Sequence, residues 1–138
     1  MVSNADVAHT YMHLLRDEPL ALPKARQISR KDFSMSLFVT YFGTQHKYPK
    51  LAHHNVMFGK RYRGLLDDIF DKGVLAEDFS IYLHAPSLSD DSLAPAGAQS
   101  YYALSPVPHL GKAAIDWNSE GPRYAQRIMS YLEERYMP

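Results

Sequence analysis

The stretch FSMSLFVTYF, residues 33–42, alternates with the period of two that is typical of a β-strand. One face of this predicted strand carries Phe33, Met35, Leu37, Val39 and Tyr41, and the other face carries Ser34, Ser36, Phe38, Thr40 and Phe42. Large apolar side chains therefore lie on both faces of the strand. The alternation predicts a strand that belongs to a sheet.

Further elements follow on both sides of this strand. Shorter alternating segments predict strands at about residues 54–58, 79–84 and 101–105, the last ended by prolines that cannot donate to a ladder. Apolar side chains spaced three and four apart predict a helix over 61–72, with Gly73 as its left-handed cap, and a last helix from about 118 to 136. Near the N-terminus, Ser3 is predicted to cap a short helix that carries apolar residues from Val7 to Leu15, and residues 17–31 are predicted to be a connector.

This order of elements predicts an α+β fold, a small antiparallel or mixed sheet with helices on one face. We expect the face that the helices leave free to carry Phe38, Phe42 and Tyr82. That face would expose apolar surface unless something covers it.

Composition excludes several classes of protein. The chain has 138 residues, enough for one ordinary domain, and a formal net charge of zero, which does not favour nucleic-acid binding. It has no cysteine, so disulfides, thiolate metal sites and a cysteine nucleophile are excluded. The first ten residues lack the pattern of a signal peptide, and no apolar run reaches the roughly 20 residues of a membrane-spanning helix.

The polar clusters do not predict a self-contained active site. His53 and His54 would point to opposite faces of a strand and so could not share one metal ion, and His9 with His13 lacks a third ligand. The acidic cluster lies opposite the apolar stripe of its helix and is predicted to be solvated, with Arg63 and Asp67 forming a pair; its members are Asp67, Asp68 and Asp71. Ser105 and His109 lack the motif of a nucleophile elbow, and no glycine pattern predicts a phosphate cradle. We therefore predict no catalytic residue and no metal ligand.

Several long motifs nevertheless resemble one family. The motifs are SNADV (3–7), SLFVTYFG (36–43), LAHH (51–54), RYRGLLDDIF (61–70), LAEDFSIYLHAP (75–86), SLAPAG (92–97), YYALSPVPHLG (101–111) and DW…EGP (116–122). Together they closely resemble bacterial phytoene desaturases, which are FAD-dependent carotenoid desaturases related to the amine-oxidase superfamily.

This resemblance implies a longer, two-domain flavoprotein. The family's G-x-G-x-x-G segment and its C-terminal flavin-binding segment have no counterpart in the 138 residues, so the chain is expected to be an internal fragment that is inactive alone. Residues 1–15 would be a remnant of the flavin domain, in which Ser3, Asn4 and Ala5 lie near FAD. Residues 16–138 would be part of the substrate-binding domain.

The resemblance also implies a ligand and a location. The C40 carotenoid precursor has no polar group, so its recognition depends on buried apolar area, and the candidate wall residues are Phe38, Phe42, Tyr82 and Tyr102. The partners would be the missing flavin-domain segments. The expected location is the cytoplasm, with peripheral contact at the inner face of the cell membrane. The alternative is a free-standing, non-catalytic α+β module that binds an apolar ligand or a protein partner.

Overall fold

A computed structural model describes residues 2–138, which form two compact units that divide after Phe33. The first unit contains α1 (Val7–His9), a π-helical turn (Thr10–Leu14), a 3₁₀ turn (Pro19–Ala21) and α2 (Leu22–Ile28). The second unit contains the sheet and the remaining helices. The predicted boundary after residue 15 concerns the resemblance to a flavin domain and stays a prediction.

The first unit differs from its sequence prediction in two ways. Asp6, not Ser3, caps α1, since the Asp6 side chain accepts a hydrogen bond from the His9 backbone. The predicted connector contains α2, because Pro19 and Pro23 lie in the first turn of their helical segments. Proline is tolerated there, since the first N–H groups of a helix have no intrahelical partner.

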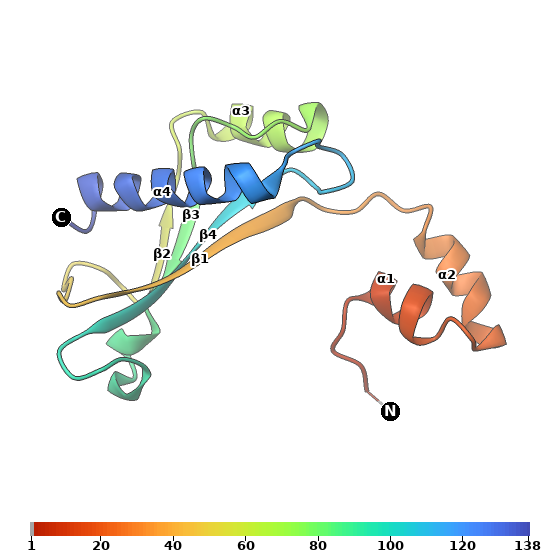
Figure 1. The fold of residues 1–138 in the computed structure, drawn as a ribbon, viewed down its shortest axis with the longest axis horizontal. Helices are drawn as coiled ribbons and strands as arrows, with labels where there is room; N and C mark the ends of the chain where they lie inside the picture. Colours follow the sequence, from red (N-terminus) through yellow and green to blue (C-terminus); the bar gives the residue numbers. More distant parts are fainter. Residues whose placement is uncertain (1) are drawn as a thin grey trace. The chain divides into compact units, whose positions relative to one another are not determined.

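The second unit is built on a four-stranded sheet, drawn in Figure 1. Its strands are β1 (Ser36–Thr44), β2 (His54–Met57), β3 (Ile81–His84) and β4 (Gln99–Val107). Their order is β1-β4-β3-β2 and every neighbouring pair is antiparallel, which is the arrangement of a Greek key. The α+β class is confirmed, and the sheet is antiparallel rather than mixed.

Strand β4 continues through Pro106 to Val107, beyond the predicted end at Ser105. The pairing of β3 with β4 reaches only Leu104, so one edge of β4 has no partner strand near Pro106. A proline can occupy such a position because no ladder hydrogen bond is required of it.

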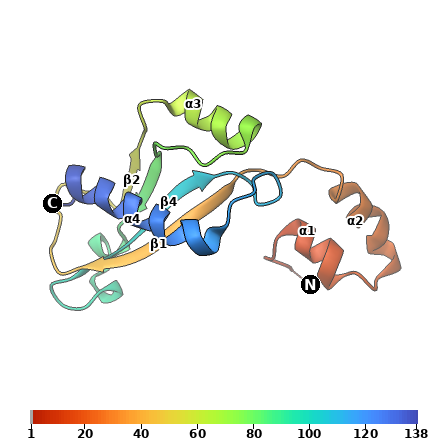
Figure 2. The same ribbon diagram turned by 45° about the horizontal axis from the view of Figure 1, so that its top comes forward.

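Helix α4 (Trp117–Arg135) covers one face of the sheet, as Figures 1 and 2 show. The buried side chains of α4 are Tyr124, Ile128 and Leu132, and they pack with sheet residues such as Leu83 and Ala103 in one core. The Tyr124 hydroxyl lies 2.8 Å from the Ser105 hydroxyl, so these two buried hydroxyls are paired.

The burial pattern corrects the prediction of which face is free. Phe38 lies edge-on against Tyr124, with 5.1 Å between ring centroids, and Phe42 stacks on Tyr101. Both phenylalanines therefore pack on the helix-covered face. Tyr82 lies on the opposite face with Leu37, because strand register and alternation separate these two sets.

Helix α3 (Tyr62–Asp67) continues as a π-helical turn (Asp68–Lys72) and ends at Gly73. Gly73 has φ of 63°, so its predicted role as a left-handed cap is confirmed. Leu65 and Ile69 form a small core with Ala76 and Met35.

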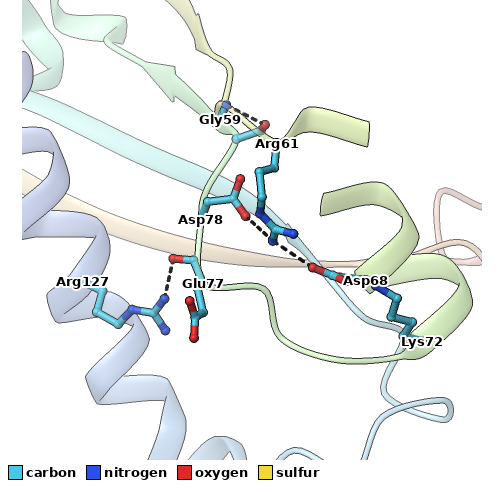
Figure 3. A network of polar contacts seen from close by, with 8 residues as sticks. Gly59, Arg61, Asp68, Lys72, Glu77, Asp78 and Arg127 are labelled. Carbon is cyan, nitrogen blue, oxygen red and sulfur yellow. Dashed lines mark hydrogen bonds and ion pairs between the residues drawn. The ribbon is translucent and has the colours of Figure 1, made fainter. Parts of the chain in front are cut away.

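An ion-pair network holds this segment, as Figure 3 shows. The Arg61 guanidinium lies 3.0 Å from Asp68 and 2.9 Å from Asp78, and Lys72 lies 2.7 Å from the other oxygen of Asp68. Asp68 is only 7% exposed, so the prediction that it is solvated is wrong. The predicted pair of Arg63 with Asp67 is absent from the ion pairs of residues 2–138.

Within the part of the chain that the structure describes, no helix combines the length and the apolar character needed to cross a bilayer. Helix α4 is 19 residues long, but charged side chains occur from Glu120 to Arg135.

Candidate functional site

The sheet face opposite α4 carries several exposed apolar side chains, and we call it the open face. Its residues are Leu37, Val39 and Tyr41 of β1, His54 and Val56 of β2, Tyr82 and His84 of β3, and Tyr102, Leu104 and Pro106 of β4. Leu37 is 48% exposed, Val56 60% and Tyr41 77%. A contiguous apolar patch of this kind is typical of an interaction or ligand-binding surface.

A row of rings crosses all four strands of the open face. Tyr41 pairs with Tyr102, Tyr102 with His84, and His84 with His54 in the strand register. The successive ring centroids lie 5.7, 4.8 and 5.2 Å apart. These separations are those of interacting aromatic pairs, so the row is continuous from one edge of the sheet to the other.

The next row of the open face is mostly aliphatic. Val39 pairs with Leu104, Leu104 with Tyr82, and Tyr82 with Val56. Tyr82 joins the two rows, since its ring centroid lies 5.9 Å from that of Tyr102 and its hydroxyl lies 2.7 Å from Nδ1 of His54. Burial raises the pKa of Tyr82, and its hydrogen bond with Tyr102 raises that pKa further.

Three histidine rings gather at one end of the open face. His53 lies at a bend just before β2 rather than inside the strand, so its ring turns toward those of His54 and His84. One ligand nitrogen from each ring lies within 4.8 Å of the others. The prediction that His53 and His54 point to opposite faces is therefore wrong, because strand alternation does not extend to a residue outside the strand.

The surroundings of His84 favour its neutral form. Burial lowers the pKa of His84, and the nearby His53 and His54 lower it further. Its Nε2 lies 2.7 Å from Nε2 of His53, and its Nδ1 is buried without a hydrogen-bond partner among the described residues.

The structure divides the predicted substrate residues between two environments. Tyr82 and Tyr102 lie side by side on the open face. Phe38 and Phe42 pack in the core beneath α4. Substrate contact by any of the four stays a prediction.

The predicted flavin neighbours lie in the first unit and are all exposed: Ser3, Asn4 and Ala5. The Ser3 hydroxyl accepts a hydrogen bond from the Ala5 backbone and lies 3.3 Å from the Thr10 hydroxyl. Since these residues are exposed, they do not enclose a cofactor by themselves, and their contact with FAD stays a prediction.

Other candidate clusters have structural explanations. Ser105 is 1% exposed and bonded to Tyr124, so it is not an accessible nucleophile. A groove of about 420 Å³ is lined by Arg61, Asp78, Phe79 and Tyr131. The Arg61 charge there is already paired with two carboxylates, so the arginine has a structural role in the ion-pair network.

The sequence prediction named only Tyr82 and Tyr102 of the open face and missed its other residues, among them Tyr41 and His84. The signal for His84 was present, because Tyr82 and His84 are two apart in a predicted strand and therefore share a face. No local pattern indicates that the His53 ring would join them.

Comparison with known proteins confirms the resemblance to phytoene desaturases. The chain is 56% identical over 138 residues to the lycopene-forming phytoene desaturase of Pantoea ananas and 54% identical over 138 residues to that of Pseudescherichia vulneris. It is 44% identical to the neurosporene-forming phytoene desaturase of Cereibacter sphaeroides, over 97% of its own length. No family model matches the chain.

The chain is thus similar over its whole length to a portion of these enzymes. It spans 28% of the length of each of the first two relatives and 27% of the third.

Proposed function

We propose that this chain is the part of an FAD-dependent phytoene desaturase that contacts the hydrocarbon, and that the open face is its contact surface. The observation that carries the proposal is an exposed apolar and aromatic sheet face in a chain 56% identical to a lycopene-forming phytoene desaturase. The reaction of the whole enzyme would introduce double bonds into the C40 precursor in carotenoid biosynthesis.

The open face suits a ligand without polar groups. Such a ligand is held by the apolar area that it removes from water and by the shape of its site. Leu37, Val39 and Tyr41 present alternate side chains over about 13 Å of β1, so an extended hydrocarbon can lie along the strand. The rings of Tyr102 and Tyr82 continue this surface across the sheet.

In this proposal FAD is held mainly by parts of the enzyme outside this chain, because the exposed residues Ser3, Asn4 and Ala5 could border a cofactor but do not enclose one. The flavin-binding segments would then cover the open face and close the hydrocarbon between the two surfaces. A lipid-soluble substrate also favours peripheral contact with the cytoplasmic side of the cell membrane.

A chimeric enzyme tests the proposal. The aligned segment of the Pantoea ananas phytoene desaturase is replaced by this chain, and the purified chimera is assayed for phytoene consumption and FAD content. We expect the chimera to consume phytoene. A chimera that binds FAD and unfolds cooperatively but leaves phytoene unchanged would overturn the proposal, and phytoene binding by the isolated chain would then favour the free-standing module.

A pair of substitutions in the chimera tests the role of the open face. Val39→Asp places a carboxylate on the open face, and we expect it to raise KM for phytoene by more than about tenfold, because burying an unpaired charge is costly. Leu110→Asp is the matched control, since Leu110 is 66% exposed and lies outside the sheet. Equal effects of the two substitutions would exclude the open face as the contact surface.

A further inference from the structure

The geometry points to a divalent transition-metal site formed by the imidazoles of His53, His54 and His84. This inference does not depend on the desaturase proposal. It rests on how the three rings converge and on what holds each ring in place.

The backbone brings the three histidine rings together. His54 and His84 are directly paired across β2 and β3, and their rings stack with centroids 5.2 Å apart. The bend at His53 brings its ring to 4.4 Å from His54 and 4.6 Å from His84, measured between centroids. The backbone of His53 is itself anchored, because its carbonyl accepts a hydrogen bond from the Ala85 backbone at 2.9 Å.

In two of the rings an oxygen partner holds Nδ1, which leaves Nε2 as the nitrogen that can face a metal ion. Nδ1 of His53 lies 2.6 Å from the Ser89 hydroxyl, and Nδ1 of His54 lies 2.7 Å from the Tyr82 hydroxyl. When each Nδ1 carries the proton, it donates to its oxygen and leaves Nε2 as an unprotonated ligand atom. Metal-binding histidines almost always have such an outer partner, which orients the ring.

The third ring supplies the remaining ligand. Nε2 of His84 lies 2.7 Å from Nε2 of His53, so one of these nitrogens carries a proton in the metal-free chain, and metal binding releases it. Two nitrogens bound to one tetrahedral zinc ion are about 3.3 Å apart, given zinc–nitrogen distances of 2.0–2.1 Å. These two nitrogens therefore need to separate by about 0.6 Å, and any pair of ligand nitrogens at the outer limit of 4.8 Å needs to close to the same spacing.

The donor set selects the kind of metal. The group consists of imidazoles alone, without cysteine and without a carboxylate. Imidazole suits zinc, copper, nickel and cobalt rather than calcium or magnesium, which prefer oxygen ligands. Three protein ligands leave a fourth position, and because His54 is exposed this position is open to water.

Metal titration of the complete 138-residue chain tests the inference. We expect calorimetry with zinc chloride in a non-chelating buffer to give one zinc ion per chain at micromolar affinity or tighter. Cobalt(II) is expected to give the intense visible bands of a four-coordinate ion. The absence of saturable zinc binding in this range would overturn the inference.

Single-residue variants test which side chains bind the metal ion. We expect His84→Gln, and separately His54→Gln at the exposed ring, to weaken zinc binding by more than about 100-fold, which exceeds the usual effect of losing an outer partner. We expect Ser89→Ala to weaken binding by about tenfold or more with an unchanged melting temperature, because Ser89 only positions His53. Circular dichroism confirms that each variant is folded.

The chain contains its own control, a second histidine pair. The rings of His9 and His13 lie 5.0 Å apart in the first unit. The double variant His9→Ala/His13→Ala is expected to bind zinc as the unaltered chain does. Loss of binding in this double variant, with binding retained in His54→Gln and His84→Gln, would place the metal elsewhere and refute the inference.

Discussion

Phe38 of β1 lies edge-on against Tyr124 of α4, with 5.1 Å between their ring centroids. This contact shows which face of β1 belongs to the core. The neighbouring Leu37 is 48% exposed on the other face. Two adjacent apolar residues of one strand thus have different roles, packing for Phe38 and surface for Leu37.

The first prediction concerns this pair. We expect Phe38→Ala to lower the free energy of unfolding by about 2–4 kcal/mol, since it removes a ring that packs in the core. Leu37→Ala is expected to cost less than about 1 kcal/mol, because its side chain is already half exposed. Urea unfolding of the two variants measures both values, and a larger loss for Leu37→Ala would contradict the assignment of the faces.

A second prediction concerns the buried hydroxyl pair beneath α4. Tyr124 and Ser105 are each 1% exposed, and their oxygens lie 2.8 Å apart. Tyr124→Phe is expected to destabilise the fold by about 1–3 kcal/mol, because it leaves the Ser105 hydroxyl buried without this partner. The double variant Tyr124→Phe/Ser105→Ala should recover part of this loss in thermal unfolding. Additive losses would show that the two hydroxyls are not coupled.

The third prediction concerns the loss of folding stability at low pH. Hydrogen bonds from Lys72 and then Arg61 lower the pKa of Asp68 below its usual value. A carboxyl with a lowered pKa stabilises the fold above its unfolded pKa of about 3.9, and this contribution is lost as pH falls through the lower folded value. We expect Asp68→Asn to unfold at lower urea concentration at pH 7 and to show a smaller further loss on acidification. Asp71→Asn, at an exposed position of the same segment, is the control. Parallel pH profiles for Asp68→Asn and the unaltered chain would contradict the role of the network.

The fourth prediction concerns Gly73. Its φ of 63° is strained for other residues, and an added Cβ would lie 2.8 Å from the Lys112 carbonyl oxygen. Gly97 has φ of 84°, and an added Cβ there would meet nothing within 4 Å. Gly97→Ala is therefore expected to show only the backbone cost, about 1–2 kcal/mol, and Gly73→Ala a larger loss. Equal melting temperatures of the two variants would mean that the Lys112 segment moves aside.

The sequence predicted most elements for local reasons. Alternation identified β1 and β4, apolar spacing identified α3 and α4, and Gly73 was recognised as a cap because only a left-handed position requires it. Helix α2 was missed because Pro19 and Pro23 were interpreted as breakers, although proline at a helix start is compatible with the helix.

The candidate site was predicted less completely than the fold. Tyr82 and Tyr102 were named, and the structure places their rings together. The histidine cluster was missed, because it depends on a bend at His53 and on the pairing of His54 with a residue 30 positions further along the chain, His84. Such pairing is a property of sheet register, which local periodicity does not specify.

The sequence by itself determined that β1 has two apolar faces, that the fold is α+β, and that the chain resembles part of a phytoene desaturase. Only the tertiary structure decided that α4 covers the face with Phe38 and Phe42 and leaves Leu37, Val39 and Tyr41 open. The physical reason is that alternation assigns side chains to the two faces of a strand but does not indicate which face is buried when both are apolar. The packing partner decides between them, and that partner, α4, begins about 70 residues after β1 ends.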